Sequence, residues 1–420
     1  MSIRQAAQRP ASASVPASHK WEFAPRFRRN AFGWKSDTPM QRIKEALAEI
    51  KAVAKKEPVL TAEGAVLFLE KLAPAINEVD SSSGAIGNAV NRAIETLVPL
   101  VAKAELSEST RDKLLERLWT TLQEDRMPYI EYLGEFWGTL CASPALSSKW
   151  ADALSPALLE SWSRPRDEDY RYFKGTAPCL SALYAAGRHD ELLALLAKAP
   201  FKFWDERIWG AKALLAAGKH TEAVCYAEAS RSFNAPSAAI GLFCEGALLA
   251  SGDAEQAYAR YAVEAAYAST NAAMYKAIVK KYPDVARERI VRDLVASQPG
   301  QEGKWFAAAK DAGLFELAIE LANRSPSDPR TLTRAARDFA QEQPAFALAA
   351  AQTALRGIAN GWGYEITSVD VLDAYAALMT ACAAAGVAPA QVHAELRAMI
   401  AASGKGGAYV GKMLQVELKA

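Results

Sequence analysis

The sequence predicts an all-α fold, an α-solenoid of stacked helical hairpins preceded by an irregular helical block. The main observation is a repeated pattern, in which a leucine stands four residues before each of Gly187, Gly218 and Gly252. These glycines are 31 and 34 residues apart, and a looser copy surrounds Gly313, which follows 61 residues later. A repeat of this length is typical of stacked helix pairs, because no pair can bury its apolar face without its neighbours.

Composition supports the same fold class. The chain has 420 residues, of which 51% are hydrophobic, and its formal net charge is +1. Alanine and leucine, which favour helix, dominate, whereas alternating runs of β-branched residues are nearly absent. The longest uncharged run, residues 374–393, contains Gly386 and Pro389 and therefore predicts a helix–turn–helix instead of a membrane span. The length suits one extended array or two to three ordinary domains.

The start of the chain differs from the rest in charge. Residues 1–35 contain seven Lys or Arg and one Glu, so the remaining chain carries a formal charge of −5. The first twenty residues have almost nothing to bury and lack the apolar core of a secretory signal. Their acid-poor composition also resembles an organellar transit peptide, although no amphipathic helix is evident. We expect residues 1–33 to form a disordered or extended basic tail and arm, and the protein to be cytoplasmic.

An N-terminal helical block is expected over residues 34–165. Ser36 to Pro39 supply a capping residue and a proline suited to the first turn of a helix. Apolar residues then recur at helical spacing in four successive stretches. These are Ile43, Leu47 and Ile50; Val66, Leu69, Leu72 and Ile76; Val90, Ile94, Leu97 and Val101; and Leu115, Leu118 and Leu122. Since these helices lack the glycine turn, the block has no clear period.

Regular hairpins are expected after the polar, proline-containing boundary at residues 163–169. In the repeats, residues 166–325, an Ala/Leu-rich helix meets a glycine turn, and a second helix opens with Glu followed by Ala or Leu. Glycine permits positive φ at the turn, and the small residue five positions later lets the two helices approach closely. Further helix pairs are expected over residues 326–420, with breaks predicted at residues 341–344, 357–363 and 386–389.

This turn resembles that of the tetratricopeptide repeat, which carries Gly and, five residues later, Ala. The pairs that match are Gly218 and Ala223, Gly252 and Ala257, and Gly313 and Ala318, while Gly187 and Leu192 match by half. The family's first-helix glycine, seven residues before the turn, is replaced by Leu180, Ala211, Glu245 and Phe306. The resemblance implies a right-handed superhelix with a concave peptide-binding groove and no catalysis of its own.

Residues that carry chemistry are few. His189 and His220 hold matching turn positions in adjacent repeats, either as solvated turn residues or as a metal-binding pair. The five cysteines are far apart, so neither a disulfide framework nor a zinc site is expected. The apolar context of Cys225 predicts a packed thiol. Residues 406–412 fit G-x-x-x-x-G-K, but Met413 replaces the magnesium-binding Ser or Thr and no strand precedes them. No catalytic, cofactor or metal site is therefore expected.

Two segments combine aromatic rings with cations. Residues 21–34 interleave them in the way that RNA or single-stranded DNA contacts require, but the same composition would anchor an arm on its own helical domain. Residues 201–212 hold large rings that either fill the core between repeats or line a groove as binding anchors. The candidate partner-binding residues are Arg26, Arg28, Arg29, Trp34, Trp204, Trp209 and Lys212.

The function expected from these features is that of a non-enzymatic interaction or scaffold protein, which holds a protein or peptide partner in a solenoid groove. The alternative is a nucleic-acid-associated protein that uses the basic aromatic arm at residues 21–35. An accessory subunit of an enzyme, or an enzyme of an unfamiliar all-α type, is a third possibility. These alternatives differ in the charge and accessibility of the surface that each one needs.

Overall fold

A computed structural model describes residues 19–163, 172–232 and 236–418 of the chain. Within these ranges the protein is all-α, as predicted, with twenty-one α-helices, three short 3-10 helices and no strand. The chain divides into two compact units, residues 1–235 and residues 236–420, which are described separately below. The boundary predicted at residues 163–169 lies almost entirely outside the described residues.

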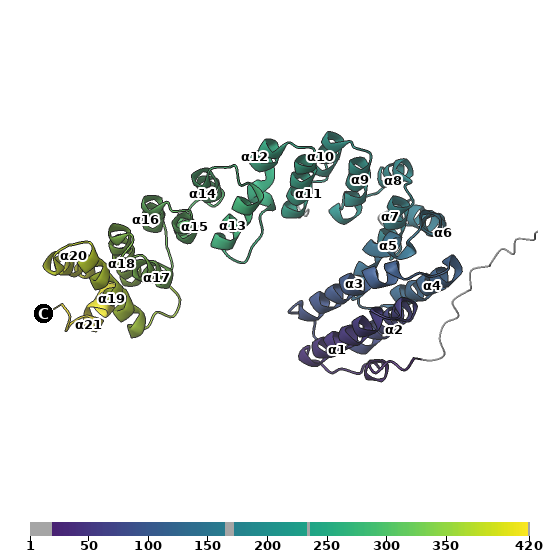
Figure 1. Ribbon diagram of the computed structural model, residues 1–420, viewed down its shortest axis with the longest axis horizontal. Coiled ribbons are helices and arrows are strands. Elements are labelled where there is room, and N and C mark those ends of the chain that lie inside the picture. Colours follow the sequence, from purple (N-terminus) through teal and green to yellow (C-terminus); the bar gives the residue numbers. More distant parts are fainter. Residues whose placement is uncertain (1–18, 164–171, 233–235, 419–420) are drawn as a thin grey trace, which may run out of the picture. The chain divides into compact units, whose positions relative to one another are not determined.

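Unit 1 begins with long helices that lie side by side and continues with shorter hairpins (Figure 1). Its elements are η1 (Ala24–Arg26), α1 (Asp37–Ala54), α2 (Pro58–Ile76), α3 (Ala85–Lys103), α4 (Glu108–Glu124), η2 (Glu131–Phe136), α5 (Trp137–Cys141), α6 (Pro144–Ser163), α7 (Thr176–Ala185), α8 (His189–Leu196), α9 (Trp204–Ala216) and α10 (His220–Glu228). All four helices predicted from apolar spacing in the N-terminal block are present as α1 to α4.

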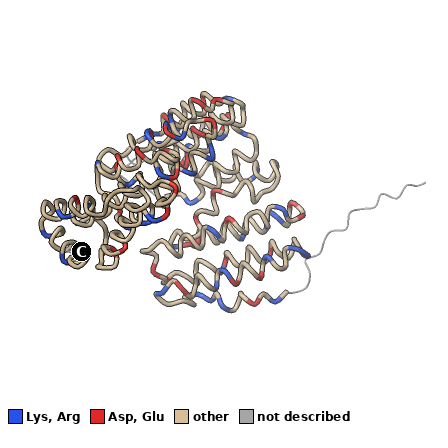
Figure 2. Tube along the Cα trace, turned by 60° about the vertical axis from the view of Figure 1, so that its left-hand side comes forward, with Lys and Arg blue, Asp and Glu red and all other residues tan. Residues whose placement is uncertain are grey.

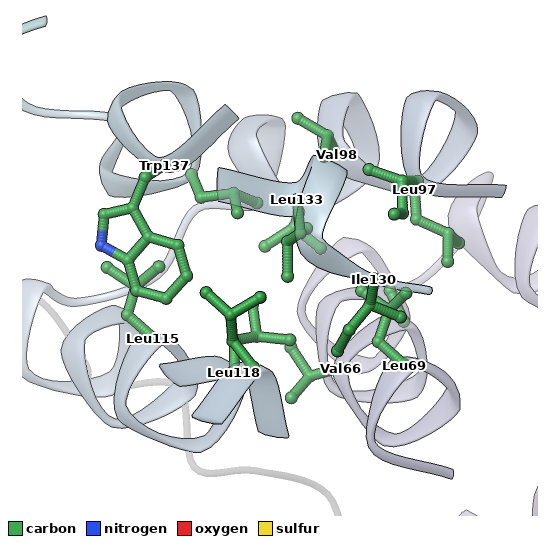
Figure 3. Close-up of a cluster of buried hydrophobic side chains, with 14 of the residues drawn as sticks. Val66, Leu69, Leu97, Val98, Leu115, Leu118, Ile130, Leu133 and Trp137 are labelled. Carbon is green, nitrogen blue, oxygen red and sulfur yellow. The ribbon is translucent and has the colours of Figure 1, made fainter. Parts of the chain in front are cut away.

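The apolar stripes of these helices converge on one core. Figure 3 shows side chains of α2, α3 and α4 pointing toward one another, with Leu133 of η2 and Trp137 of α5 closing the cluster. Trp137 and Leu133 have no exposed surface. Each fully buried side chain of this size stabilises the fold by about 1.5–3 kcal/mol. Packing of the apolar helix faces against one another therefore supplies much of the stability of this block.

A buried arginine, Arg111 of α4, joins the ends of two other helices in this block. The Arg111 guanidinium donates hydrogen bonds to the carbonyl oxygens of Val101 at 3.0 Å, Ala104 at 2.6 Å and Leu140 at 3.1 Å, and is 6% exposed. The carbonyls at a helix end lack partners within the helix, and a cation also suits the negative end of the helix dipole. Arg111 therefore ties the end of α3 to the end of α5.

The aromatic arm is docked on α1 and α2. Trp21, Phe23, Phe27 and Phe32 are all buried, and the rings of Phe23 and Phe27 pack against Phe68 at centroid distances of 5.6 and 5.2 Å. The main-chain N–H groups of residues 22 and 23 donate to the carboxylate of Glu49. Self-anchoring of the arm is thus confirmed for four rings, and the described part of the segment expected to be disordered or extended, residues 19–33, is docked on the helices.

The glycine turns have the backbone conformation that the repeat pattern predicts. Gly218 and Gly252 have φ of 74° and 83°, a left-handed conformation that side chains with a Cβ rarely adopt. At each turn the N–H of the glycine and the N–H after it donate to carbonyls of the preceding helix, at 2.9–3.1 Å, in the Schellman arrangement. Ala223 and Ala257, five residues later, are fully buried where the two helices meet. The same geometry recurs at Gly187, Gly313 and Gly386.

Unit 2 consists of successive helix pairs in the part of the chain that the structure describes. These are α11 (Ser237–Ala250) with α12 (Ala254–Ala265), α13 (Asn271–Lys281) with α14 (Arg287–Ala296), η3 (Glu302–Trp305) and α15 (Phe306–Asp311) with α16 (Phe315–Arg324), α17 (Pro329–Asp338) with α18 (Pro344–Ala359), and α19 (Ser368–Ala384) with α20 (Pro389–Ala402), followed by α21 (Gly404–Met413). The G-x-x-x-x-G-K stretch lies inside α21.

One departure from the tetratricopeptide pattern has a structural reason. Glu245 of α11, at a position where that family has glycine, is 1% exposed. Its carboxylate accepts a hydrogen bond from Tyr282 at 2.8 Å and pairs with Lys281 at 2.6 Å, both at the end of α13. A buried carboxylate is tolerated only with such partners. Glu245 thereby fixes α13 against α11.

Two expectations were wrong. The glycine-rich loop was expected to begin at Gly357, but α18 continues to Ala359, and Gly357 is a buried helical residue facing the Trp362 ring. Cys225 was expected to be a packed thiol, but it is exposed on α10. The buried face of α10 is formed by Ala223, Val224 and Ala227 instead, which leaves the cysteine between them on the solvent side. The other four cysteines are buried.

Candidate binding groove

A groove of about 690 Å³ crosses the first elements of three successive helix pairs in unit 1. It runs over η2, α7 and α9, and η2 and α9 both contact α7. Its described lining consists of Glu131, Tyr132, Glu135, Phe136, Tyr172, Thr176, Ala177, Leu180, Phe203, Trp204, Asp205, Glu206, Ile208 and Lys212. Four carboxylates therefore share the groove with five aromatic rings and one ammonium group.

A buried serine holds the η2 wall in place. The Ser181 hydroxyl of α7, 2% exposed, donates to the main-chain carbonyl of Glu135 at 3.0 Å and accepts from the N–H of Gly138 at 3.0 Å. Gly134 permits the close approach, since a Cβ there would lie 2.7 Å from the Pro178 ring. The Glu135 side chain is thus carried on a backbone fixed to α7.

The groove carboxylates are incompletely compensated. Burial raises the pKa of Glu135 to about 7, with Lys212 lowering it and Asp205 raising it. Burial also raises the pKa of Glu206 to about 7, with a further contribution from the Asp205 charge. Among the described residues, none of these three carboxylates forms an ion pair. A carboxylate whose charged form is disfavoured in this way gains the most from an incoming cation.

Aromatic rings surround these charges. Phe203 is 51% exposed and Tyr172 is 61% exposed at the mouth, whereas Trp204 is buried beneath. The rings of Tyr132 and Phe136 meet edge to face with centroids 5.1 Å apart. The Tyr172 hydroxyl donates to the Glu131 carboxylate. Exposed rings beside carboxylates are suited to cations, which interact favourably with ring faces as well as with the negative charges.

Lys212 of α9 lines the groove, and Trp209 of the same helix lies beneath its ammonium group. The Lys212 ammonium lies 4.2 Å from the centroid of the Trp209 ring, and burial lowers the pKa of this lysine while Glu135 raises it. Trp209 is 5% exposed, and its indole N–H forms no hydrogen bond with the described residues. This N–H lies near enough to Glu135 to favour the charged form of that carboxyl. The buried Trp209 N–H is therefore directed to the Glu135 carboxylate, although it does not reach hydrogen-bond geometry.

The seven predicted site residues separate into two groups. Trp204 and Lys212 line the groove, and Trp209 contacts Lys212 without lining it. None of the four arm residues lines it. Arg26 pairs with Glu45 at 2.9 Å, and the Arg28 side chain donates to the carbonyl of Pro25. The other two residues, Arg29 and Trp34, are exposed, and Trp34 is 72% exposed.

The carboxylates of the groove were missed in the sequence. Asp205 and Glu206 directly follow Trp204, and Glu131 and Glu135 alternate with Tyr132 and Phe136. Aromatic residues interleaved with acids in two segments were the available signal. It was weak because the segments are about seventy residues apart and only the η2–α7–α9 packing unites them.

A second groove, of about 710 Å³, lies in unit 2 between α17 and α19. Arg330, Arg334 and Arg337 form a stripe along α17 and face Asp370 and Asp373 of α19. Arg330 donates to both oxygens of Asp370 at 2.6 and 3.0 Å, and the Asp370 carboxylate also accepts the N–H of Thr367. Here Arg330 and Asp370 neutralise each other.

Charge elsewhere is distributed evenly. Figure 2 shows Lys and Arg interspersed with Asp and Glu along the helices instead of gathered into one block. Among the described residues, no three His, Cys, Asp or Glu side chains converge in a way that could hold a metal ion. His189 stacks on Tyr184 with ring centroids 5.3 Å apart. None of the described helices is both long enough and apolar enough to cross a membrane.

Comparison of the chain with known protein families, with curated proteins and with solved structures finds no match in any of the three. The likeness to tetratricopeptide repeats therefore rests on the spacing and geometry of the glycine turns alone.

Proposed function

We propose that the protein is a non-enzymatic interaction protein whose groove on η2, α7 and α9 binds a basic segment of a partner protein. The observation that carries this proposal is the group of incompletely compensated carboxylates in a ring-lined groove. Four carboxylates and one lysine leave three formal negative charges on its lining. A peptide bearing two or three Lys or Arg residues complements that charge.

Binding at this site would relieve a cost that the free protein carries. Glu135 and Glu206 are held where their charged forms are disfavoured, so each gains when a Lys or Arg side chain supplies the missing counter-charge. The exposed ring of Phe203 adds area for the aliphatic part of the same side chain. The groove therefore recognises both parts of a basic residue.

Nucleic acid is the less favoured partner. A groove with excess negative charge repels phosphate, and four rings of the basic arm are buried, so they are inaccessible for stacking on bases. The arm instead stabilises the N-terminal block. Arg26, Arg28 and Arg29 are exposed, but of the five Trp and Phe rings at residues 21–34 only Trp34 is exposed with them.

Fluorescence anisotropy with a short labelled peptide rich in Lys and Arg tests the proposal. The wild-type protein is expected to bind this peptide, to bind an acidic peptide of equal length far more weakly, and to lose affinity as salt rises. The double variant Glu135→Gln/Glu206→Gln should weaken binding by about tenfold or more, since each lost charge pair is worth about 1 kcal/mol or more in a partly buried site.

A matched control removes two carboxylates of unit 2. Asp373→Asn/Glu342→Gln changes the formal charge of the chain by the same amount at exposed positions outside the groove. Its affinity should equal that of the wild type. Absence of binding to the basic peptide, or equal weakening by the groove and control variants, would contradict the proposal.

A further inference from the structure

Lys212 holds an unusual position for a lysine. It is the only cation among the described residues that line the groove, and its ammonium lies over the Trp209 ring at 4.2 Å. It is half-buried, and among the described residues it makes neither an ion pair within 4.0 Å nor a hydrogen bond. An ammonium group is strongly hydrated, so half-burial without an ion pair is unfavourable unless a negative charge and a ring face lie nearby.

The negative charge that acts on Lys212 comes from the η2 wall of the groove. Glu135 on η2 acts on its ammonium from one side, and Asp205 of its own helix acts on the same carboxylate. The Trp209 indole N–H also lies close to Glu135 and favours the charged form of its carboxyl. A partner's cation would bind next to Glu135. Lys212, a cation of the chain itself, already acts on that carboxylate.

We infer that Lys212 is an internal substitute for the partner's cation, which competes with an incoming Lys or Arg side chain for Glu135 and thereby limits the affinity of the groove. This inference rests on the function proposed above and assigns Lys212 a specificity role within it. The competition is of low cost to the partner, because Lys212 has no direct ion pair to break.

A displaced Lys212 ammonium can leave its place over the Trp209 ring by rotation about side-chain bonds, without loss of the helix. The weakly held internal cation keeps the carboxylates partly compensated in the free protein. A partner with fewer than two cations gains little over Lys212, and a strongly basic segment gains much.

Titration of the same basic peptide against Lys212 variants tests the inference. Lys212→Met keeps an unbranched stem over Trp209 and removes the charge, so the affinity is expected to rise about tenfold. Lys212→Arg keeps the positive charge, so its affinity should not rise as that of Lys212→Met does. Lys198→Met, which removes the same charge at an exposed position of unit 1, should leave the affinity unchanged. Melting curves establish that each variant is folded, and Lys212→Gln replaces the Met variant if it is not.

The outcomes separate the two proposals. Binding by the wild type with unchanged affinity in Lys212→Met and Lys212→Gln would overturn the role of Lys212 and leave the groove function standing. Weaker binding by Lys212→Met would also overturn it, because it would make Lys212 a contact for the partner. Binding by Lys212→Met but not by the wild type would support the competition and contradict the proposed function of the natural chain. Absence of binding by every variant would overturn both.

Discussion

The two grooves of this protein have nearly the same size and the same architectural origin, but they differ in whether their carboxylates form ion pairs. One groove measures about 690 Å³ and the other about 710 Å³, and each lies on the first elements of successive helix pairs within its own unit. In unit 2 the Arg330 guanidinium donates two hydrogen bonds to the Asp370 carboxylate. In unit 1 the carboxylates of Glu135 and Glu206 have no ion-pair partner among the described residues. The helix-pair architecture provides a groove, and the side chains decide whether its charge is used internally or left for a ligand.

The pKa shifts show the same contrast. The hydrogen bond from Arg330 and the contacts at Thr367 hold the pKa of the Asp370 carboxyl well below its usual range. Burial raises the pKa of Glu135 and that of Glu206 to about 7. A lowered carboxyl pKa marks a charge that stabilises the fold, and a raised one marks a charge that the fold tolerates at a cost. Carboxyl groups with raised pKa values are concentrated at functional sites.

The largest expected effect concerns what the two units share. Gly218 forms the turn between α9 and α10 in unit 1, and Gly386 forms the turn between α19 and α20 in unit 2. Their φ angles are 74° and 68°. Gly218→Val and Gly386→Val should each lower the free energy of unfolding by about 1–3 kcal/mol, because a branched side chain is strained in this conformation. Urea denaturation followed by circular dichroism measures this change in stability.

Gly246→Ala, in the middle of α11 with open space around it, is the control and should be neutral or stabilising. Unchanged stability in either Val variant would break the common architecture.

The second prediction is that peptide binding depends on pH in the range where the groove carboxylates titrate. A basic peptide binds the charged forms of Glu135 and Glu206, so affinity should rise by about tenfold or more from pH 5.5 to pH 8. Glu135→Gln/Glu206→Gln should flatten this profile. Anisotropy titrations at constant ionic strength measure it, and a pH-independent affinity in the wild type would contradict the assignment of these two residues.

The third prediction concerns the compensated carboxylate of unit 2. Asp370→Ala removes the capping box of α19 and the partner of Arg330, and should lower the free energy of unfolding by about 1 kcal/mol. The exposed ion pair adds little to the loss of the cap. Affinity for the basic peptide should not change. A large loss of affinity in this variant would move the binding site to unit 2.

The smallest effect has the opposite sign. The folded-state pKa of Glu135 is raised, so the folded protein binds more protons than the unfolded chain between about pH 4.5 and pH 7, and stability falls as pH rises through that window. Glu135→Gln should therefore be as stable as the wild type at pH 5.5, and more stable by up to about 1 kcal/mol at pH 8. Denaturation at the two pH values measures this. A less stable variant at pH 8 would mean that the Glu135 charge supports the fold.

Local features of the fold were predictable because short stretches determine them. The spacing of Ile43, Leu47 and Ile50 is enough to predict α1, and the position of Gly218 between two apolar helices is enough to predict its positive φ. Docking of the aromatic arm was also predictable, since rings such as Phe27 lose water contact only by packing on the chain's own helices.

The groove was not predictable in the same way, because its charges come from distant segments. Trp204 and Lys212 were found from their density of rings and cations, but Glu135 belongs to η2, which the packing of α7 holds beside α9. The exposure of Cys225 was missed for a related reason. Its neighbours are apolar, and only the direction in which α10 packs decides which of them faces solvent.

The most direct test of the central claim locates the bound peptide on the chain. A Lys- and Arg-rich peptide that carries a photoreactive group in place of one residue is bound to the full-length protein, irradiated and mapped by mass spectrometry. Cross-links are expected within residues 131–136, 172–180 and 203–212, which line the groove of unit 1, and an excess of unlabelled basic peptide should abolish them. Cross-links on α17 and α19 of unit 2, or spread over both units, would contradict the claim that the incompletely compensated carboxylates make the binding site.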